Sequence, residues 1–248
     1  MAHPNNGPLA VERKQGRIGK ALIRLFMKRA TIIASEALSD RFRLVSLEGP
    51  ELREVQWTPG QKVQIAMGSA FVARTYTPIA WDADQGRTRI LGFAHGAGPG
   101  SEWLRRVKAG DECDVFGPRA SLGVRQLEGP FAIFGDESSL GLACALTGQY
   151  PHRLVAGYFE ADDAADTAAV AVRLGMAATH VFGRSMGEAH IVDLEATLPG
   201  LIASGHVFVL TGKAGTVQRL RQKLKEYGVP SGRIRAKAYW APGKVGMD

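Results

Sequence analysis

The segment from Arg74 to Pro78, with the sequence Arg-Thr-Tyr-Thr-Pro, carries a cation, an aromatic ring and two hydroxyl groups. In a β-strand, Arg74 and Tyr76 would project from one face, and Thr75 and Thr77 from the other. A cation can bind phosphate, an aromatic ring can lie along a flat heterocycle, and a hydroxyl can hydrogen bond to a ring nitrogen. The segment therefore fits a flat, phosphorylated cofactor, and it equally fits an ordinary strand with a surface arginine.

A glycine-rich stretch runs from His95 to Ser101, about twenty residues further on. After it, Trp103, Leu104 and Val107 recur at helical spacing, and Ser101 stands where a helix N-cap is expected. The pattern therefore predicts a helix that begins at Ser101. The free N–H groups at such a helix start bind anions, and pyrophosphate is a common one. A plain loop with a serine cap is the alternative.

These two motifs occur together in a known family. Arg-x-Tyr-Thr at 74–77 and His-Gly-x-Gly-Pro-x-Ser at 95–101 resemble the siderophore-interacting proteins, which are flavin-dependent ferric-siderophore reductases of the ferredoxin-NADP reductase superfamily. Further similar segments are 42–49, 59–61, 110–111, 117–119, 135–138 and the terminal Tyr239-Trp240. The resemblance runs from roughly residue 17 to 246 and is weakest between 150 and 205.

The resemblance implies that the chain binds FAD. It implies a hydrogen bond from Thr77 near the reactive flavin nitrogen, which makes Thr77 the candidate catalytic residue. The FAD contacts that we expect are Arg74, Thr75, Tyr76, Thr77, Phe93, His95, Gly96, Gly98, Pro99, Gly100, Ser101, Tyr239 and Trp240. Core packing is the competing explanation for the two terminal rings.

The resemblance also implies a path for NAD(P)H at the carboxyl ends of later strands, where ligands of α/β sheets bind. Asp136, Ser138 and Thr211 would border this path, and Arg184 and Lys213 are the cations that we select for a 2′-phosphate. The chain lacks Gly-x-Gly-x-x-Gly and departs from the family pattern at 139–141 and at Lys213. Asp136 could instead cap a helix and Lys213 could be a solvated cation, so the preference between NADH and NADPH stays open.

Four further cations are candidates for binding an anionic iron chelate, by charge and by resemblance. They are Lys62, Arg235, Lys237 and Lys244. The family usually has arginine after the terminal Tyr-Trp, and here the residue is Ala241. The role of that cation is therefore in doubt.

The composition favours anionic partners. Among 248 residues, 31 Lys and Arg outnumber 24 Asp and Glu, which gives a net charge of +7. Such a surface attracts carboxylate-rich chelates, nucleotides or an acidic ferredoxin. No run of interleaved aromatic and basic residues points to nucleic acid. The six histidines and the cysteines Cys113 and Cys144 show no ligand spacing, so we expect iron to arrive chelated by its substrate, with no protein-bound metal.

Short runs rich in β-branched residues predict an antiparallel barrel in the first half of the chain. The runs are 31–34, 42–47, 63–67, 72–79, 88–93 and 112–116. Strands at 131–134, 154–159, 180–182, 207–211 and 234–240 then alternate with helical segments at 140–146, 161–174, 193–203 and 216–227. This alternation is typical of a parallel sheet covered by helices.

The sequence thus predicts an α/β protein of two domains, an N-terminal antiparallel β-barrel that binds FAD and a parallel α/β sandwich domain. Residues 1–16 would be a disordered tail, 17–127 the barrel domain with an N-terminal helix, and 128–248 the NAD(P)H-binding-like domain, with turn chemistry at the boundary. The basic amphipathic segment 17–30 would dock on the protein or contact a membrane surface. No stretch is long and apolar enough to span a membrane, and cysteine usage suits the cytoplasm.

The resulting hypothesis is an FAD-dependent ferric-siderophore reductase that takes electrons from NAD(P)H. One alternative is the same flavoprotein with reduced ferredoxin as its electron donor, which the basic surface would suit. Another is a non-catalytic module that binds siderophores or a membrane surface. This module would be colourless when purified.

Overall fold

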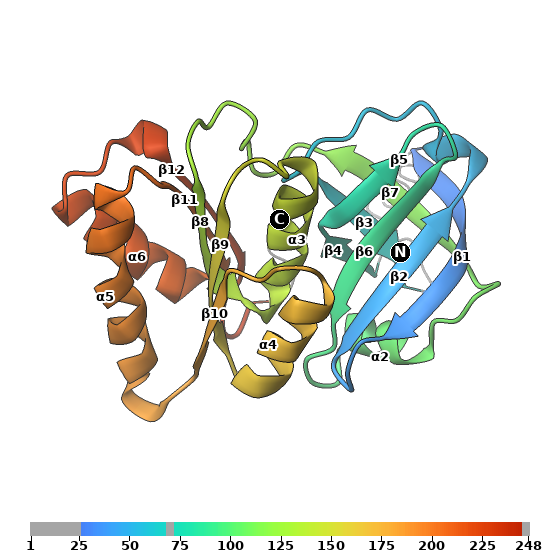
Figure 1. The fold of residues 1–248 in the computed structure, drawn as a ribbon. Coiled ribbons are helices and arrows are strands. Elements are labelled where there is room, and N and C mark those ends of the chain that lie inside the picture. Colours follow the sequence, from blue (N-terminus) through green and yellow to red (C-terminus); the bar gives the residue numbers. More distant parts are fainter. Residues whose placement is uncertain (1–25, 68–71, 245–248) are drawn as a thin grey trace, which may run out of the picture.

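A computed structural model describes residues 26–67 and 72–244 (Figure 1). The first half of the chain forms a seven-stranded antiparallel sheet with the strand order β4-β3-β7-β1-β2-β6-β5. Its strands are β1 (Met27–Ala37), β2 (Phe42–Glu48), β3 (Lys62–Ala66), β4 (Ala73–Tyr76), β5 (Pro78–Asp82), β6 (Arg87–Phe93) and β7 (Glu112–Arg119). The predicted antiparallel β-layer is confirmed.

The sheet closes on itself at Thr77. Strands β4 and β5 are the two edges of the sheet, yet only Thr77 separates them along the chain. The edges must therefore meet at this residue, which gives the barrel shape seen in Figure 1. The single strand predicted at 72–79 was wrong, because Pro78 lacks the N–H that would continue the ladder of β4. Thr77 consequently sits at a corner between two strands.

Helix α2 (Pro99–Arg106) lies between β6 and β7, and it begins two residues earlier than predicted. Its N-cap is Gly98, with Pro99 as the first helical residue, a position that tolerates proline because its missing N–H would have no partner there. Ser101 is therefore not the cap. Its hydroxyl donates a 2.8 Å hydrogen bond to the backbone carbonyl of His95 and fixes the preceding loop to the helix.

The second half of the chain is a parallel sheet with the order β10-β9-β8-β11-β12 and helices on both faces, as predicted. The strands are β8 (Phe131–Asp136), β9 (Val155–Ala161), β10 (Thr179–Gly183), β11 (Val207–Lys213) and β12 (Ile234–Trp240). The helices are α3 (Leu140–Gln149), α4 (Ala164–Arg173), α5 (Ala189–Ala203) and α6 (Ala214–Glu226). Short 3₁₀ turns lie at Pro50–Leu52, Glu137–Ser139, Met186–Glu188 and Ser231–Arg233.

One hydrophobic core joins the two halves. Helices α3 and α4 lie between the parallel sheet and the barrel, whereas α5 and α6 cover the opposite face (Figure 1). Buried Leu44 and Ile79 of the barrel belong to the same cluster as Leu140 and Phe159 of the parallel sheet domain. The predicted boundary at 127–130 falls in the connection between β7 and β8. The barrel and the sheet are thus held as one packed unit.

The predicted basic helix at 17–30 is only partly open to description, because residues 17–25 lie outside the described ranges. Residues 27–30 belong to β1, so a helix that continued to residue 30 was wrong. In β1, Ala30 and Ile32 point into the core, with the alternation of a strand. Within 26–67 and 72–244, no α-helix has the length and hydrophobicity needed to cross a bilayer.

Candidate functional site at the junction of the barrel and the parallel sheet

The two motifs that suggested a phosphate site lie against each other. An added Cβ on Gly100, in the first turn of α2, would lie only 2.9 Å from Cγ of Arg74. The aliphatic part of the Arg74 side chain therefore lies directly over the helix start, where only glycine leaves room for it. Its guanidinium Nη1 donates a 2.9 Å hydrogen bond to the Ala73 carbonyl. No ion pair among the described residues involves Arg74, so its charge remains available to an anion.

The loop before α2 is exposed and held at its ends. His95, Gly96, Gly98 and Pro99 are all exposed, and Gly96 has a positive φ of 65°. Arg105 donates a 2.7 Å hydrogen bond to the Gly96 carbonyl, which keeps that carbonyl turned toward the protein. The loop thus offers free backbone next to Arg74 and the positive end of α2.

The aromatic residues predicted near the flavin differ in their surroundings. The Tyr76 ring lies 6.0 Å from the Trp103 ring of α2, and burial raises the pKa of its phenol. Phe93 packs between the Phe42 ring at 4.8 Å and the Arg41 guanidinium at 4.6 Å. Both rings are only partly buried, and Thr75 is exposed. Contact of these side chains with FAD stays a prediction.

Thr77 lies at the junction of the two domains and meets the last strand of the chain. Burial raises the pKa of the Tyr239 phenol to about 12, and a hydrogen bond with Thr77 partly offsets this effect. Tyr239 also approaches Thr211 at the carboxyl end of β11. That contact is poorly aligned, because the Thr211 hydroxyl is buried and lacks a hydrogen-bond partner within the described residues. The structure therefore brings together three residues that the sequence had placed far apart.

Trp240 and Asp136 form a second link at this junction. The indole N–H of Trp240 donates a 2.6 Å hydrogen bond to Oδ2 of Asp136, whose other oxygen accepts from the Ser138 N–H and hydroxyl. Asp136 also caps the 3₁₀ turn before α3, so the helix-cap interpretation is confirmed. Burial raises the pKa of Asp136. Its carboxylate is enclosed on one side by Gly212.

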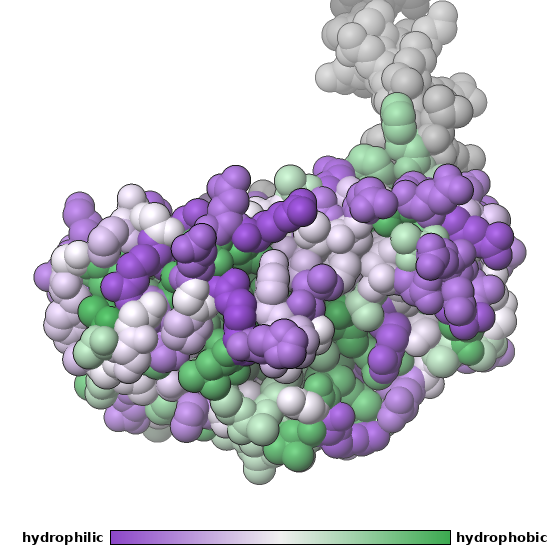
Figure 2. All heavy atoms as spheres, turned by 45° about the horizontal axis from the view of Figure 1, so that its top comes forward, coloured by the Kyte–Doolittle hydropathy of each residue, from purple (hydrophilic) through white to green (hydrophobic). Residues whose placement is uncertain are grey.

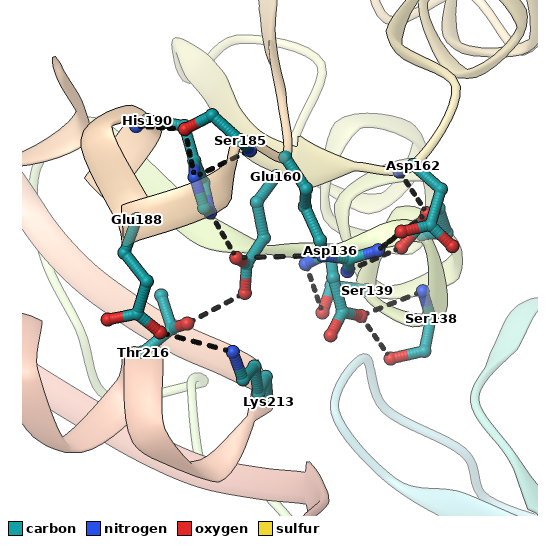
Figure 3. Close-up of polar contacts among 12 residues, drawn as sticks. Asp136, Ser138, Ser139, Glu160, Asp162, Ser185, Glu188, His190, Lys213 and Thr216 are labelled. Carbon is teal, nitrogen blue, oxygen red and sulfur yellow. Dashed lines mark hydrogen bonds and ion pairs between the residues drawn. The ribbon is translucent and has the colours of Figure 1, made fainter. Parts of the chain in front are cut away.

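The two cations selected for a 2′-phosphate are both paired with carboxylates. Arg184 donates to Oε2 of Glu137 at 2.8 Å and to Oδ1 of Asp162 at 2.7 Å. Lys213 lies 3.4 Å from Glu188 (Figure 3). Burial alone would lower the pKa of Arg184, but the hydrogen bonds with Glu137 and Asp162 raise it. This pairing argues against the predicted phosphate role, because a phosphate would have to displace carboxylates.

Glu160 anchors a buried polar network next to Arg184 that the sequence reasoning missed. It is fully buried, and it bonds to Nε2 of His190 at 2.9 Å and to the Thr216 hydroxyl at 2.7 Å (Figure 3). Nδ1 of His190 lies 3.2 Å from the Ser185 hydroxyl. A carboxylate within the apolar run 155–161 was the only signal in the sequence. The network ties β9 to α5 and α6.

Arg119 is a second functional candidate that the sequence reasoning did not select. Its Nε and Nη2 atoms are buried without a hydrogen-bond partner among the described residues, and its guanidinium lies 4.4 Å from the Phe116 ring. Buried donors without partners are uncommon and point to a missing acceptor. Arg119 is paired across the sheet with Lys62. An anion is the natural partner for this guanidinium.

The four predicted substrate cations are in unequal positions. Lys62 is buried, so it is poorly placed to receive a bulky chelate from solution. Arg235 donates a 2.9 Å hydrogen bond to the Gly123 carbonyl in the connection to β8, and Lys237 shares its face of β12. Lys244 is exposed beyond the strand. Figure 2 shows that hydrophilic side chains cover much of one face, as expected for a charged protein. No group of three metal-ligating side chains was found within the described ranges.

Comparisons with known proteins agree with these features. The model of the siderophore-interacting FAD-binding domain matches residues 67–122, and the model of the siderophore-interacting protein matches residues 130–243. The two ranges together take in more than half of the chain. No curated protein sequence matches the chain significantly.

Several solved structures share the fold. The siderophore-interacting protein SipS from Aeromonas hydrophila is 23% identical with a TM-score of 0.69, covering 88% of this chain and 93% of that chain. A siderophore utilization protein from T. fusca is 19% identical with a TM-score of 0.68, covering 90% and 95%. The ferredoxin reductase in carbazole 1,9a-dioxygenase is 18% identical with a TM-score of 0.70, covering 86% and 68%. The architecture is therefore the two-domain fold of ferredoxin reductases.

Proposed function

Because this chain belongs to the siderophore-interacting protein family, we propose that it is an FAD-dependent reductase that uses NAD(P)H to release iron from ferric siderophores as Fe(II). The matched FAD-binding domain and the reductase-like fold support a flavin-dependent reductase role. The cytoplasm is the proposed location, since it supplies NAD(P)H and suits the two free cysteines, Cys113 and Cys144.

The observation that carries the proposal is the contact between Arg74 and Gly100. It places a guanidinium that has no carboxylate partner among the described residues at the positive end of α2, beside an exposed glycine loop. Charge, helix dipole and free backbone N–H groups all favour a diphosphate at this one place. The residues present therefore fit FAD, with Arg74 and the loop from His95 to Ser101 holding its diphosphate.

When bound, FAD would accept two electrons from a reductant and pass them one at a time to an acceptor such as ferric iron. Thr77 would orient the ring system, because it lies at the barrel corner that faces the carboxyl ends of β11 and β12. The Tyr239 phenol lies beside the Thr77 hydroxyl, and Trp240, which is 37% exposed and fixed through its N–H, offers a ring face at the same junction. These residues position the reactants, and no side-chain acid or base is required.

The substrate would be an anionic ferric chelate. Arg235 and Lys237 supply positive charge on β12 for such a ligand. One NAD(P)H carries two electrons, so it reduces two ferric ions and releases one proton with NAD(P)⁺. Hard oxygen chelators hold Fe(II) less tightly than Fe(III), so reduction frees the metal.

The proposal is tested by anaerobic mixing of the purified yellow protein with NADH or NADPH, followed by a ferric siderophore and a ferrous trap. We expect loss of the visible flavin absorbance and then formation of trapped Fe(II). Thr77→Ala should slow flavin reduction about tenfold, since one oriented hydrogen bond is lost, and Thr77→Ser should restore it. Colourless protein, or flavin that no nicotinamide nucleotide reduces, contradicts the proposal.

A further inference from the structure

The crevice of the parallel sheet defines where a nucleotide would lie. The order β10-β9-β8-β11-β12 reverses direction between β8 and β11, and ligands bind at such a switch point, outside the carboxyl ends of the strands. Thr77, Tyr239 and Thr211 mark this point on the flavin side. A nicotinamide placed there leaves the adenosine half of the nucleotide over the neighbouring strand ends. On the β9 and β10 side, these ends carry Asp162 and Arg184.

Two kinds of side chain read the adenosine ribose in α/β folds. A carboxylate after the second strand accepts hydrogen bonds from the ribose hydroxyls, whereas a nearby arginine accommodates a 2′-phosphate. This chain has both, because Asp162 follows β9, the second strand of the parallel sheet, and Arg184 follows β10. Whether the site accepts a free ribose or a 2′-phosphate depends on which of these two side chains is available to the nucleotide.

Carboxylates of the protein itself hold the guanidinium of Arg184. Glu137 holds it through two hydrogen bonds, from Nη2 at 2.8 Å and from Nη1 at 3.1 Å, and Glu160 lies 3.7 Å from its Nε. The carboxylate of Glu137 is almost completely buried and also accepts the Asp162 N–H at 2.8 Å. Moving Arg184 outward would leave this buried carboxylate without its partner, which is strongly unfavourable.

Asp162 is the accessible member of the cluster. Its side chain is 54% exposed, whereas that of Arg184 is 21% exposed. The hydrogen bond from Arg184, with a smaller effect of Arg41 at 3.5 Å from the other oxygen, lowers the pKa of Asp162, so the carboxylate stays charged. Each oxygen still has a lone pair for a ribose hydroxyl. Three carboxylates surround Arg184, and Asp162 also lies 3.5 Å from the guanidinium of Arg41. The three carboxylates outnumber these two guanidinium groups, and Lys213 pairs with Glu188. The local charge repels a dianionic phosphate.

We propose that Asp162 selects the unphosphorylated ribose, so that the chain binds NADH in preference to NADPH. Arg184 acts as a positioning residue that orients Asp162 and is itself held by Glu137. The inference rests on the proposed function, because it specifies the nucleotide that the reductase accepts. It assigns selectivity to Asp162, which the sequence analysis did not select, and gives Arg184 a role other than the expected binding of a 2′-phosphate.

The test measures binding without any redox step. The full-length protein is titrated with ADP-ribose and with 2′-phospho-ADP-ribose by calorimetry. We expect ADP-ribose to bind at least about tenfold more tightly. Asp162→Ala should weaken ADP-ribose binding about tenfold and narrow the difference between the two ligands. Asp193→Ala is the matched control, because it also removes one exposed carboxylate, in α5, and therefore changes the net charge equally. It should leave both affinities unchanged.

Equal or tighter binding of the 2′-phosphorylated ligand would overturn the inference while leaving the reductase proposal intact. Failure of both ligands to bind, or an unchanged ratio in Asp162→Ala, would also overturn it. The reductase proposal fails by a different result, a protein that carries no flavin. The two claims are therefore separable.

Discussion

The indole N–H of Trp240 donates a 2.6 Å hydrogen bond to the carboxylate of Asp136, joining the end of the last strand to the end of the first strand of the parallel sheet. The two residues are 104 positions apart, and the bond spans β11, which lies between their two strands in the sheet. Asp136 at the same time caps the turn that starts α3. One buried carboxylate therefore positions both an exposed aromatic ring and the helix that packs on the barrel.

Replacing Gly212 should disturb this carboxylate directly. Gly212 has a φ of 92°, and a Cβ added to it would lie 2.5 Å from Oδ2 of Asp136. Gly212→Ala should destabilise the protein by about 2 kcal/mol or more, from backbone strain and from the loss of the Trp240 bond. Thermal unfolding measures the effect. Gly215→Ala, three residues on with open space around its Cβ, should be neutral or slightly stabilising. Equal losses in both variants would contradict the account.

Arg74 should dominate FAD retention. Arg74→Ala removes a charge-assisted contact to the diphosphate, so the FAD dissociation constant should rise about ten- to a hundredfold. Fluorescence titration of the flavin-free protein measures this constant. Arg87→Ala, at an exposed barrel arginine paired with Glu48, is the control and should bind FAD as the native protein does. An unchanged FAD affinity in Arg74→Ala would contradict the proposal that Arg74 binds the FAD diphosphate.

Gly100 should affect FAD binding through its contact with the Arg74 side chain. A methyl group at Gly100 would press on the Arg74 side chain at 2.9 Å and displace its guanidinium from the helix start. Gly100→Ala should therefore weaken FAD binding several-fold with little change in unfolding temperature, because the arginine side chain can move. Gly148→Ala, in α3 with no atom near its Cβ, should leave FAD binding unchanged and leave the unfolding temperature unchanged or slightly raised. Weakened binding in both variants would point to a general effect on folding.

Tyr239 should give the protein a distinct sensitivity to alkaline pH. Its pKa rises from 10.0 to about 12 on folding, so the unfolded chain loses this proton first as pH increases. The stabilisation is complete below pH 10 and is lost between about pH 10 and about pH 12. Denaturant unfolding at pH 8 and pH 11 should show a smaller fall in stability for Tyr239→Phe than for the native protein. Parallel falls would show that the phenol is not held in its neutral form.

Much of the architecture was predictable from local pattern. The alternation of Val63 and Ile65 with polar neighbours marked β3, and the later alternation of strands and helices marked the parallel sheet. Two local details were missed although signals existed. Pro78 ended the strand at Thr77, and Pro99 marked the first residue of α2.

The pairing of charged side chains could not be predicted from the sequence. Arg184 is a free cation in any local reading, and its bond to Glu137 depends on a residue 47 positions away that the fold brings beside it. The Trp240 bond to Asp136 has the same long-range origin. Sequence motifs identified residue types that suit the chemistry. Only the packed structure separates the cations that are available, such as Arg74, from those that are already paired.

The most direct test of the central claim is to reduce the FAD-loaded protein chemically in the absence of oxygen and mix it with a ferric siderophore and a ferrous trap. The account predicts return of the oxidised flavin spectrum together with two trapped Fe(II) ions for each flavin. A flavin that stays reduced while the ferric siderophore remains intact would contradict the assignment of a ferric-siderophore reductase.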